Sequence, residues 1–188
     1  GADLDFRPIL DRPLETLHSL VNFNVITVTT ASYFFLRAMR SRNRGGAVIM
    51  SSVSGLVGGQ PGSGMYSATK AFELTLAESL HCELRPHNVD VIGVAAPPMS
   101  TPAAVRALQA AGTASPQIIS ALYKPADVVR TVLSMLGKSP SCIFDFVGVE
   151  TELGAVTASA RHRRMRAVET SVAKMFPPEK LASEKPGK

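Results

Sequence analysis

The sequence predicts an α/β fold built on a parallel β-sheet, and three observations lead to this prediction. Short apolar runs alternate with longer segments of helical character. The runs at residues 47–51 and 89–95 are almost continuously apolar, as expected for parallel strands covered on both faces. The first run ends in two serines and the second is followed by two prolines, so each has a defined carboxyl end. Ligands of open α/β sheets bind at that end.

The expected elements follow one another as helix, strand, helix, strand. The apolar segment 14–39 has the length of a helix, and a second helical pattern runs from Tyr66 to residue 84. Pro125 suits the first turn of a further helix through residues 136 and 137, because its missing N–H is not needed there. We expect parallel strands at residues 47–51, 89–95 and 143–147.

The sequence Tyr66-Ser67-Ala68-Thr69-Lys70 places a phenol and an ammonium four residues apart at the start of the second helix. Residues four apart are neighbours on a helix, so Lys70 can favour the phenolate of Tyr66. Free tyrosine titrates near pH ~10, and a close, partly desolvated cation would lower that pKa towards neutrality. The pair could then give and take a proton. A packed tyrosine beside a solvated lysine is the simpler alternative.

Two serines, Ser51 and Ser52, end the apolar run ahead of this motif. Side chains alternate along a strand, so Ser51 would point to the opposite face from Ser52. Ser54 is a third candidate, two residues on in the loop. Upstream, Asn24 lies within the first helical segment, where it could also bond a backbone carbonyl and bend the helix.

Asn24, Ser52, Tyr66 and Lys70, in this order and on these elements, resemble the short-chain dehydrogenase/reductase family over residues 1–147. The resemblance implies a doubly wound, Rossmann-type sheet and NAD or NADP as cofactor. It also implies that Ser52 polarises a substrate carbonyl, Tyr66 transfers the proton, Lys70 binds the nicotinamide ribose and lowers the tyrosine pKa, and Asn24 holds a relay water. The chemistry agrees, because hydride transfer leaves negative charge on oxygen that needs hydrogen-bond donors and a proton source.

The resemblance implies a further cofactor contact after the second strand. The family commonly has Pro-Gly there with a threonine a few residues later, whereas this chain has Pro97-Pro98-Met99-Ser100-Thr101. Proline removes an N–H, so the amide contact would be lost or would move to Met99. Pro97, Met99 and Thr101 are the candidate cofactor residues of this loop.

A glycine-rich strand-turn-helix unit, which a dinucleotide-binding fold requires, does not precede residue 14. Gly55, Gly58 and Gly59 follow a strand but open no helix at a phosphate site, so we interpret them as a turn. We therefore expect an N-terminally truncated fold. Residues 1–150 would be the C-terminal catalytic part, and residues 151–188 a basic helical tail with a disordered end.

Residues 99–123 occupy the place of the family's substrate-covering segment and are rich in Ala, Ser and Pro. Their apolar side chains would suit a hydrophobic carbonyl or alcohol of lipid, acyl or steroid type, although ordinary packing helices have the same composition. The apolar faces of residues 14–39 and 66–84 could form the helix-bundle homo-oligomer common in the family. They could equally pack only on the sheet.

Composition indicates a soluble enzyme of the cytoplasm. The histidines and the cysteines Cys82 and Cys142 have no metal-site spacing, so we expect no metal, and the cysteines make a poor disulfide framework. Polar residues interrupt the apolar segment 14–39, so we expect no span of the roughly 18 residues that a membrane requires. No signal peptide is visible in the sequence.

The net charge of +5 lies entirely in the tail, since residues 1–154 carry 12 basic and 12 acidic side chains. A basic helix could lie on an anionic membrane surface, but we favour a helix that packs its apolar side chains on the body. We expect no nucleic-acid binding, because no set of base-stacking aromatics accompanies the charge.

The sequence supports two hypotheses from different classes. The first is an NAD(P)-dependent oxidoreductase that interconverts a hydrophobic alcohol and its ketone. The second is a catalytically silent family member that serves as a binding or interaction module. A glycine-rich strand-turn-helix unit encoded upstream would favour the enzyme.

The basic tail gives a first testable prediction. Electrostatic attraction to a membrane would be screened over about 8 Å at physiological ionic strength, so it would weaken with salt. We expect little sedimentation of the protein with anionic vesicles, measured against neutral vesicles as control. Strong, salt-sensitive binding that is lost when the chain is truncated after Gly154 would contradict the packing-helix hypothesis.

Overall fold

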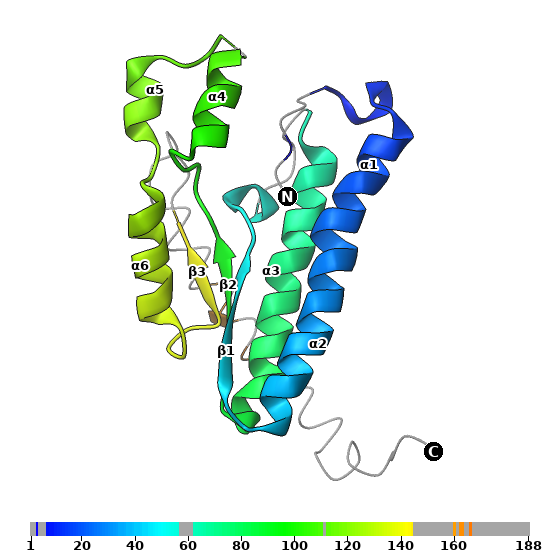
Figure 1. Ribbon diagram of the computed structural model, residues 1–188, viewed down its shortest axis with the longest axis vertical. Coiled ribbons are helices and arrows are strands. Elements are labelled where there is room, and N and C mark those ends of the chain that lie inside the picture. The colour runs from blue at the N-terminus through cyan, green and yellow to red at the C-terminus, as the bar shows by residue number, and fades with distance from the viewer. Residues whose placement is uncertain are drawn as a thin grey trace.

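The computed structural model describes residues 7–56, 62–110 and 112–144, together with residues 3, 160, 162, 163 and 166. Within this part a parallel sheet of order β1-β2-β3 is covered by helices on both faces (Figure 1). The strands are β1 (Gly45–Met50), β2 (Val89–Ala95) and β3 (Ser141–Ile143). The helices are α1 (Leu14–Val21), α2 (Thr27–Ser41), α3 (Gly64–Leu84), α4 (Pro102–Ala110), α5 (Pro116–Ala121) and α6 (Pro125–Met135). The predicted Rossmann-type architecture is confirmed.

The strands lie where the sequence predicts them, with shifts at their ends. β1 begins two residues before the expected start because Gly45 and Gly46 pair with Val89 and Asp90, although glycine has a low strand propensity. β3 begins at Ser141, since pairing with β2 starts at Gly93 opposite Ser141. Residues 145–147 of that expected strand lie outside the described residues.

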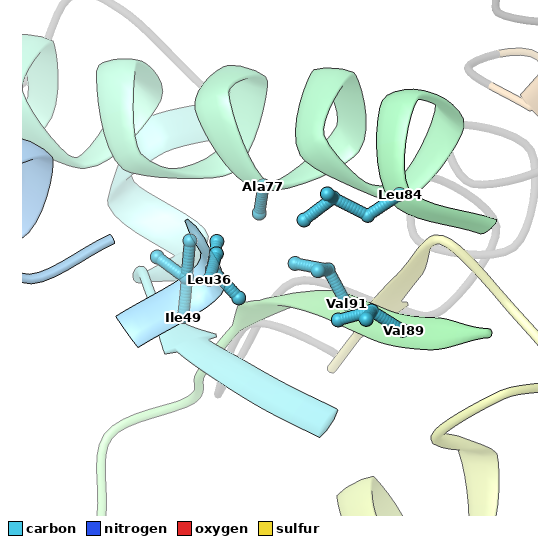
Figure 2. Packing of buried hydrophobic residues seen from close by; sticks show 6 residues of the cluster. All are labelled: Leu36, Ile49, Ala77, Leu84, Val89 and Val91. Carbon is cyan, nitrogen blue, oxygen red and sulfur yellow. The ribbon is translucent and has the colours of Figure 1, made fainter. Parts of the chain in front are cut away.

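The central strand, β2, is buried on both faces, which explains its apolar sequence. Val89 and Val91 face α2 and α3 in a cluster with Leu36, Ile49, Ala77 and Leu84 (Figure 2). Ile92 and Val94 face the opposite way, towards Val128 and Val132 of α6. The alternation follows from the two-residue period of a strand.

Helix α3 packs closely on β2 at a strand residue that has no side chain. A Cβ at Gly93 would lie 2.9 Å from both the Cβ of Ala77 and a Cδ of Leu74. Both helix residues are completely buried. Gly93 therefore fixes the helix that carries Tyr66 and Lys70 against the sheet.

The first helical segment is continuous from Leu14 to Ser41, and its middle is a π-helical turn at Asn22–Ile26. By length and composition this helix could cross a membrane, contrary to the expectation from its polar interruptions. Core helices of soluble proteins can have the same length and apolar composition. Here Leu17, Leu20 and Leu36 are buried, while Phe34 and Phe35 are about two-thirds exposed.

The segment 99–123 leaves the sheet at the carboxyl end of β2 and returns to the same place. A parallel bridge between Met99 and Tyr123 brings its two ends together, and α4 and α5 lie between them (Figure 1). Neither helix has a buried residue. The segment therefore projects from the sheet edge at which the site lies.

His162 of the tail touches the body of the protein. The His162 ring Nε2 lies 2.8 Å from Oγ of the buried Ser141, the first residue of β3. The apolar tail residues on which the packing-helix hypothesis depends lie outside the described residues, so that hypothesis stays a prediction.

The edge of β1 gives a second prediction. In the part of the chain that the structure describes, β1 pairs only with β2, and Met50 is 40% exposed. An apolar strand edge invites association, and folded domains are stable by only about 5–15 kcal/mol. We expect these 188 residues, expressed alone, to associate and to unfold without a sharp transition. Light scattering and thermal denaturation measure both; a monodisperse, cooperatively unfolding preparation would contradict the prediction.

Candidate active site

The structure brings Ser52 and Tyr66 together at the carboxyl end of β1. Ser52 follows that strand, and Tyr66 lies in the first turn of α3. The backbone N–H of Ser54 donates to Ser52 Oγ at 3.2 Å, which leaves the serine proton available. Ser52 hydrogen-bonds to the Tyr66 hydroxyl, and this bond acts to lower the pKa of the tyrosine. Two hydroxyl donors thus share one half-buried location.

Lys70 lies one turn further along α3 and is buried, with 5% of its surface exposed. Its Nζ donates to Oε2 of Glu73 at 2.7 Å and to the backbone carbonyl of Met50 at 3.1 Å. The same atom lies 5.8 Å from the centroid of the Tyr66 ring, at the outer limit of a cation–π contact. The predicted neighbourhood of Tyr66 and Lys70 is therefore present.

The electrostatics differ from those expected from the motif. The pKa of Tyr66 lies above its ordinary value, chiefly because burial disfavours the phenolate. The Ser52 bond opposes this effect, whereas the negative charges of Glu73 and Asp3 add to it. The expectation that Lys70 brings the tyrosine towards neutrality does not hold in this state, because the ammonium is already paired with Glu73.

Glu73 is itself almost completely buried, at 2% exposure. Burial raises the pKa of its carboxyl, and the hydrogen bond and charge of Lys70 partly offset that rise. A buried charge needs a close partner of opposite charge, so each side chain of this pair makes the burial of the other possible. Asp3 is paired in the same way, with Arg12 Nη1 2.7 Å from its carboxylate.

Asn24 is fully buried in the π-helical turn and reaches across to α3. Its Nδ2 donates to Thr69 Oγ1 at 3.0 Å, and the threonine hydroxyl donates to the backbone carbonyl of Tyr66 at 2.8 Å. The side chain therefore supports the helical turn that carries the tyrosine. A π-helical turn at a functional residue is a recurrent feature of active sites.

The loop after β1 is fastened to α3 beside Lys70. Ser51 is buried, and its hydroxyl donates to the backbone carbonyl of Lys70, so it has a different partner from Ser52. A Cβ at Gly55 would lie 2.7 Å from the backbone of Lys70 and Ala71. Gly55 therefore allows the loop to lie directly against the backbone of α3. The sequence predicts only a turn at this position.

The candidate cofactor loop follows β2 at the same edge of the sheet. The backbone N–H of Val53 donates to the carbonyl of Ala96 at 3.0 Å, which joins the ends of β1 and β2. Pro97 is buried and Met99 is half-buried. Thr101 Oγ1 accepts from the backbone N–H of Ala104 at 3.2 Å, so it caps α4 and keeps a proton to donate.

Three supporting residues were not identified from the sequence: Glu73, Thr69 and Asp3. Glu73 falls at Lys70 plus three, a spacing at which helical ion pairs form, and this spacing could have indicated it. Thr69 lies within the motif, but its partner is 45 residues away in sequence. No local pattern indicates that contact.

Comparison with known proteins finds relatives among the dehydrogenases. A 7β-hydroxysteroid dehydrogenase of Mediterraneibacter gnavus is 30% identical over 138 residues, which are 73% of this chain and 52% of the relative. A cyclopentanol dehydrogenase of Comamonas testosteroni is 26% identical over 144 residues, 74% of this chain and 57% of the relative. The chain thus spans about half the length of these curated relatives.

Solved structures show the same fold. A structure from work on 7β-hydroxysteroid dehydrogenase stereoselectivity superimposes with a TM-score of 0.62 and 28% identity, over 79% of this chain and 56% of that one. ElxO with NADP bound has a TM-score of 0.66 at 17% identity, over 78% of this chain and 62% of its own, and is similar in fold alone. A family model described as short chain dehydrogenase matches residues 2–111, more than half of the sequence, and the chain therefore belongs to the short-chain dehydrogenase family.

Proposed function

We propose that the protein carrying this chain is an NAD(P)-dependent oxidoreductase that interconverts a hydrophobic alcohol and its ketone, with Tyr66 as general acid and base. The observation that carries the proposal is the shared location of the Ser52 and Tyr66 hydroxyls, with the Lys70 ammonium within 5.8 Å of the tyrosine ring. Donors grouped in this way can hold a carbonyl oxygen and supply its proton.

The residues present fit the nicotinamide end of NAD or NADP. The bridge to Tyr123 uses the carbonyl of Pro98 and the N–H of Ser100, so within the described residues the Met99 N–H has no hydrogen-bond partner. That N–H and the Thr101 hydroxyl would hold the carboxamide, and Lys70 would hold the ribose. The cofactor, when bound, supplies or accepts the hydride.

The chain's own groups would manage the charge and the proton. Ser52 donates to the substrate oxygen, and Tyr66 transfers the proton to or from that oxygen. Asn24, held by Thr69, supports the Tyr66 turn. In the proposed mechanism Asn24 would also take part in a proton relay. The buried carboxylate of Glu73 and the backbone carbonyl of Met50 hold the ammonium in place.

The substrate class rests on the projecting segment 99–123 and on the relatives. The segment that carries α4 and α5 leaves the sheet at the carboxyl end of β2, and its apolar side chains would cover a hydrophobic substrate there. The relatives act, by name, on a hydroxysteroid and on cyclopentanol, both alicyclic alcohols. A secondary alicyclic alcohol or ketone is therefore the first substrate to test. The proposal includes a cytoplasmic protein that works as a homo-oligomer.

Replacement of Tyr66 tests the proposal. Tyr66→Phe keeps the ring and removes the hydroxyl, so kcat for ketone reduction should fall by about 10² to 10⁴, the usual contribution of a general acid. The longest natural form of the protein is used, and Tyr33→Phe, on the exposed face of α2, is the matched control. Near-normal turnover by Tyr66→Phe with every ketone that the wild type reduces would refute the role.

Lys70→Met separates cofactor binding from proton transfer. The ammonium is removed while the length and much of the volume of the side chain are kept. We expect the Kd for NADH or NADPH, measured by fluorescence titration, to rise at least about tenfold, because charge-assisted bonds contribute about 1.5–3 kcal/mol. Unchanged affinity in a folded variant would remove Lys70 from the cofactor site.

A further inference from the structure

A buried carboxylate that the proposed chemistry does not use lies beside the Tyr66–Lys70 pair. Glu73 is 2% exposed and binds the Lys70 ammonium at 2.7 Å. A second bond ties that ammonium to the Met50 carbonyl at 3.1 Å. Neither bond goes to the Tyr66 hydroxyl, whose partner is Ser52.

We propose that Glu73 is a positioning residue that holds and neutralises the Lys70 ammonium beside the Tyr66 ring, so that Tyr66 rests as a proton donor at neutral pH. The inference rests on the proposed function, and it adds a bias of the resting site towards carbonyl reduction. Two of the three N–H donors of Lys70 are occupied by Glu73 and Met50, which leaves one for any other partner.

The charges around Tyr66 support this reading. Glu73 and Asp3 both raise the pKa of the tyrosine, and no cation is among the groups that lower it. Asp3 forms an ion pair with Arg12, at 2.7 Å, and its contribution to the Tyr66 pKa is smaller than that of Glu73. The titratable side chains of the neighbouring helix α1, Glu15 and His18, are exposed. Glu73 is thus the closest control on the charge that Lys70 presents.

The consequence is that Glu73 sets the pH range in which Tyr66 loses its proton. With Glu73 present, the phenolate that alcohol oxidation requires forms only at high pH. Without it, the ammonium has lost its anionic partner and acts on the phenol more fully. A cation within about 4–6 Å lowers the pKa of an acid by roughly 1–3.

The test is a ¹³Cζ-tyrosine NMR titration of the protein without cofactor, in its longest natural form, with Tyr66 assigned from Tyr66→Phe. Glu73→Gln should lower the Tyr66 pKa by about one pH unit or more. Glu78→Gln removes another buried acid of α3, one not among the groups that act on Tyr66, and should leave the pKa unchanged. An unaltered Tyr66 pKa in a folded Glu73→Gln variant would overturn the inference.

Glu73→Asp covers the case in which Glu73→Gln does not fold. It keeps the charge but withdraws the carboxylate by one methylene, so the Tyr66 pKa should fall part of the way, and no change would again overturn the inference. The pH profile of alcohol oxidation should shift to lower pH by the same amount. The titration needs no turnover, so its result is independent of the proposed function. If Tyr66→Phe loses activity but the Glu73 variants leave the Tyr66 pKa unchanged, the role of Glu73 is wrong and the proposed function stands.

Discussion

The close packing of α3 on β2 is the constraint on which the rest of the site depends. Gly93 allows the contact, since any Cβ there would meet Ala77 and Leu74 at 2.9 Å. Gly55 allows the loop after β1 to lie against the same helix at Lys70. These two close contacts bury Lys70, and a buried ammonium must have hydrogen-bond or charged partners. Glu73 and the Met50 carbonyl are those partners.

Burial also explains why the electrostatics of the site differ from a simple tyrosine–lysine pair. Desolvation is the largest influence on Tyr66 and raises its pKa, as it does for the carboxyl of Glu73. Once the Lys70 charge is paired, little of it remains to favour a phenolate. The site therefore keeps its proton on the phenol, which suits a group that donates a proton to a carbonyl oxygen.

Much of the fold could be predicted from the sequence, because its signals are local. The apolar run of β2 and the helical pattern after Tyr66 each carry their own period, and the structure has both elements there. The start of β1 at Gly45 could not be predicted, because it depends on the pairing of Gly45 with Val89. The juxtaposition of Ser52 and Tyr66 was predicted through the family resemblance. The Asn24–Thr69 contact depends on tertiary packing and has no local signal. The cofactor roles of Pro97, Met99 and Thr101 stay predictions.

The central claim is that these residues transfer a proton while a hydride passes between cofactor and substrate, and label transfer tests it most directly. The longest natural form of the protein would be incubated with NADH or NADPH deuterated at C4, each face in turn, and with a panel of alicyclic ketones. We predict deuterium on the carbinol carbon of a product, from one face of the cofactor only, by mass spectrometry. Retention of the label by both cofactors with every ketone would contradict the account.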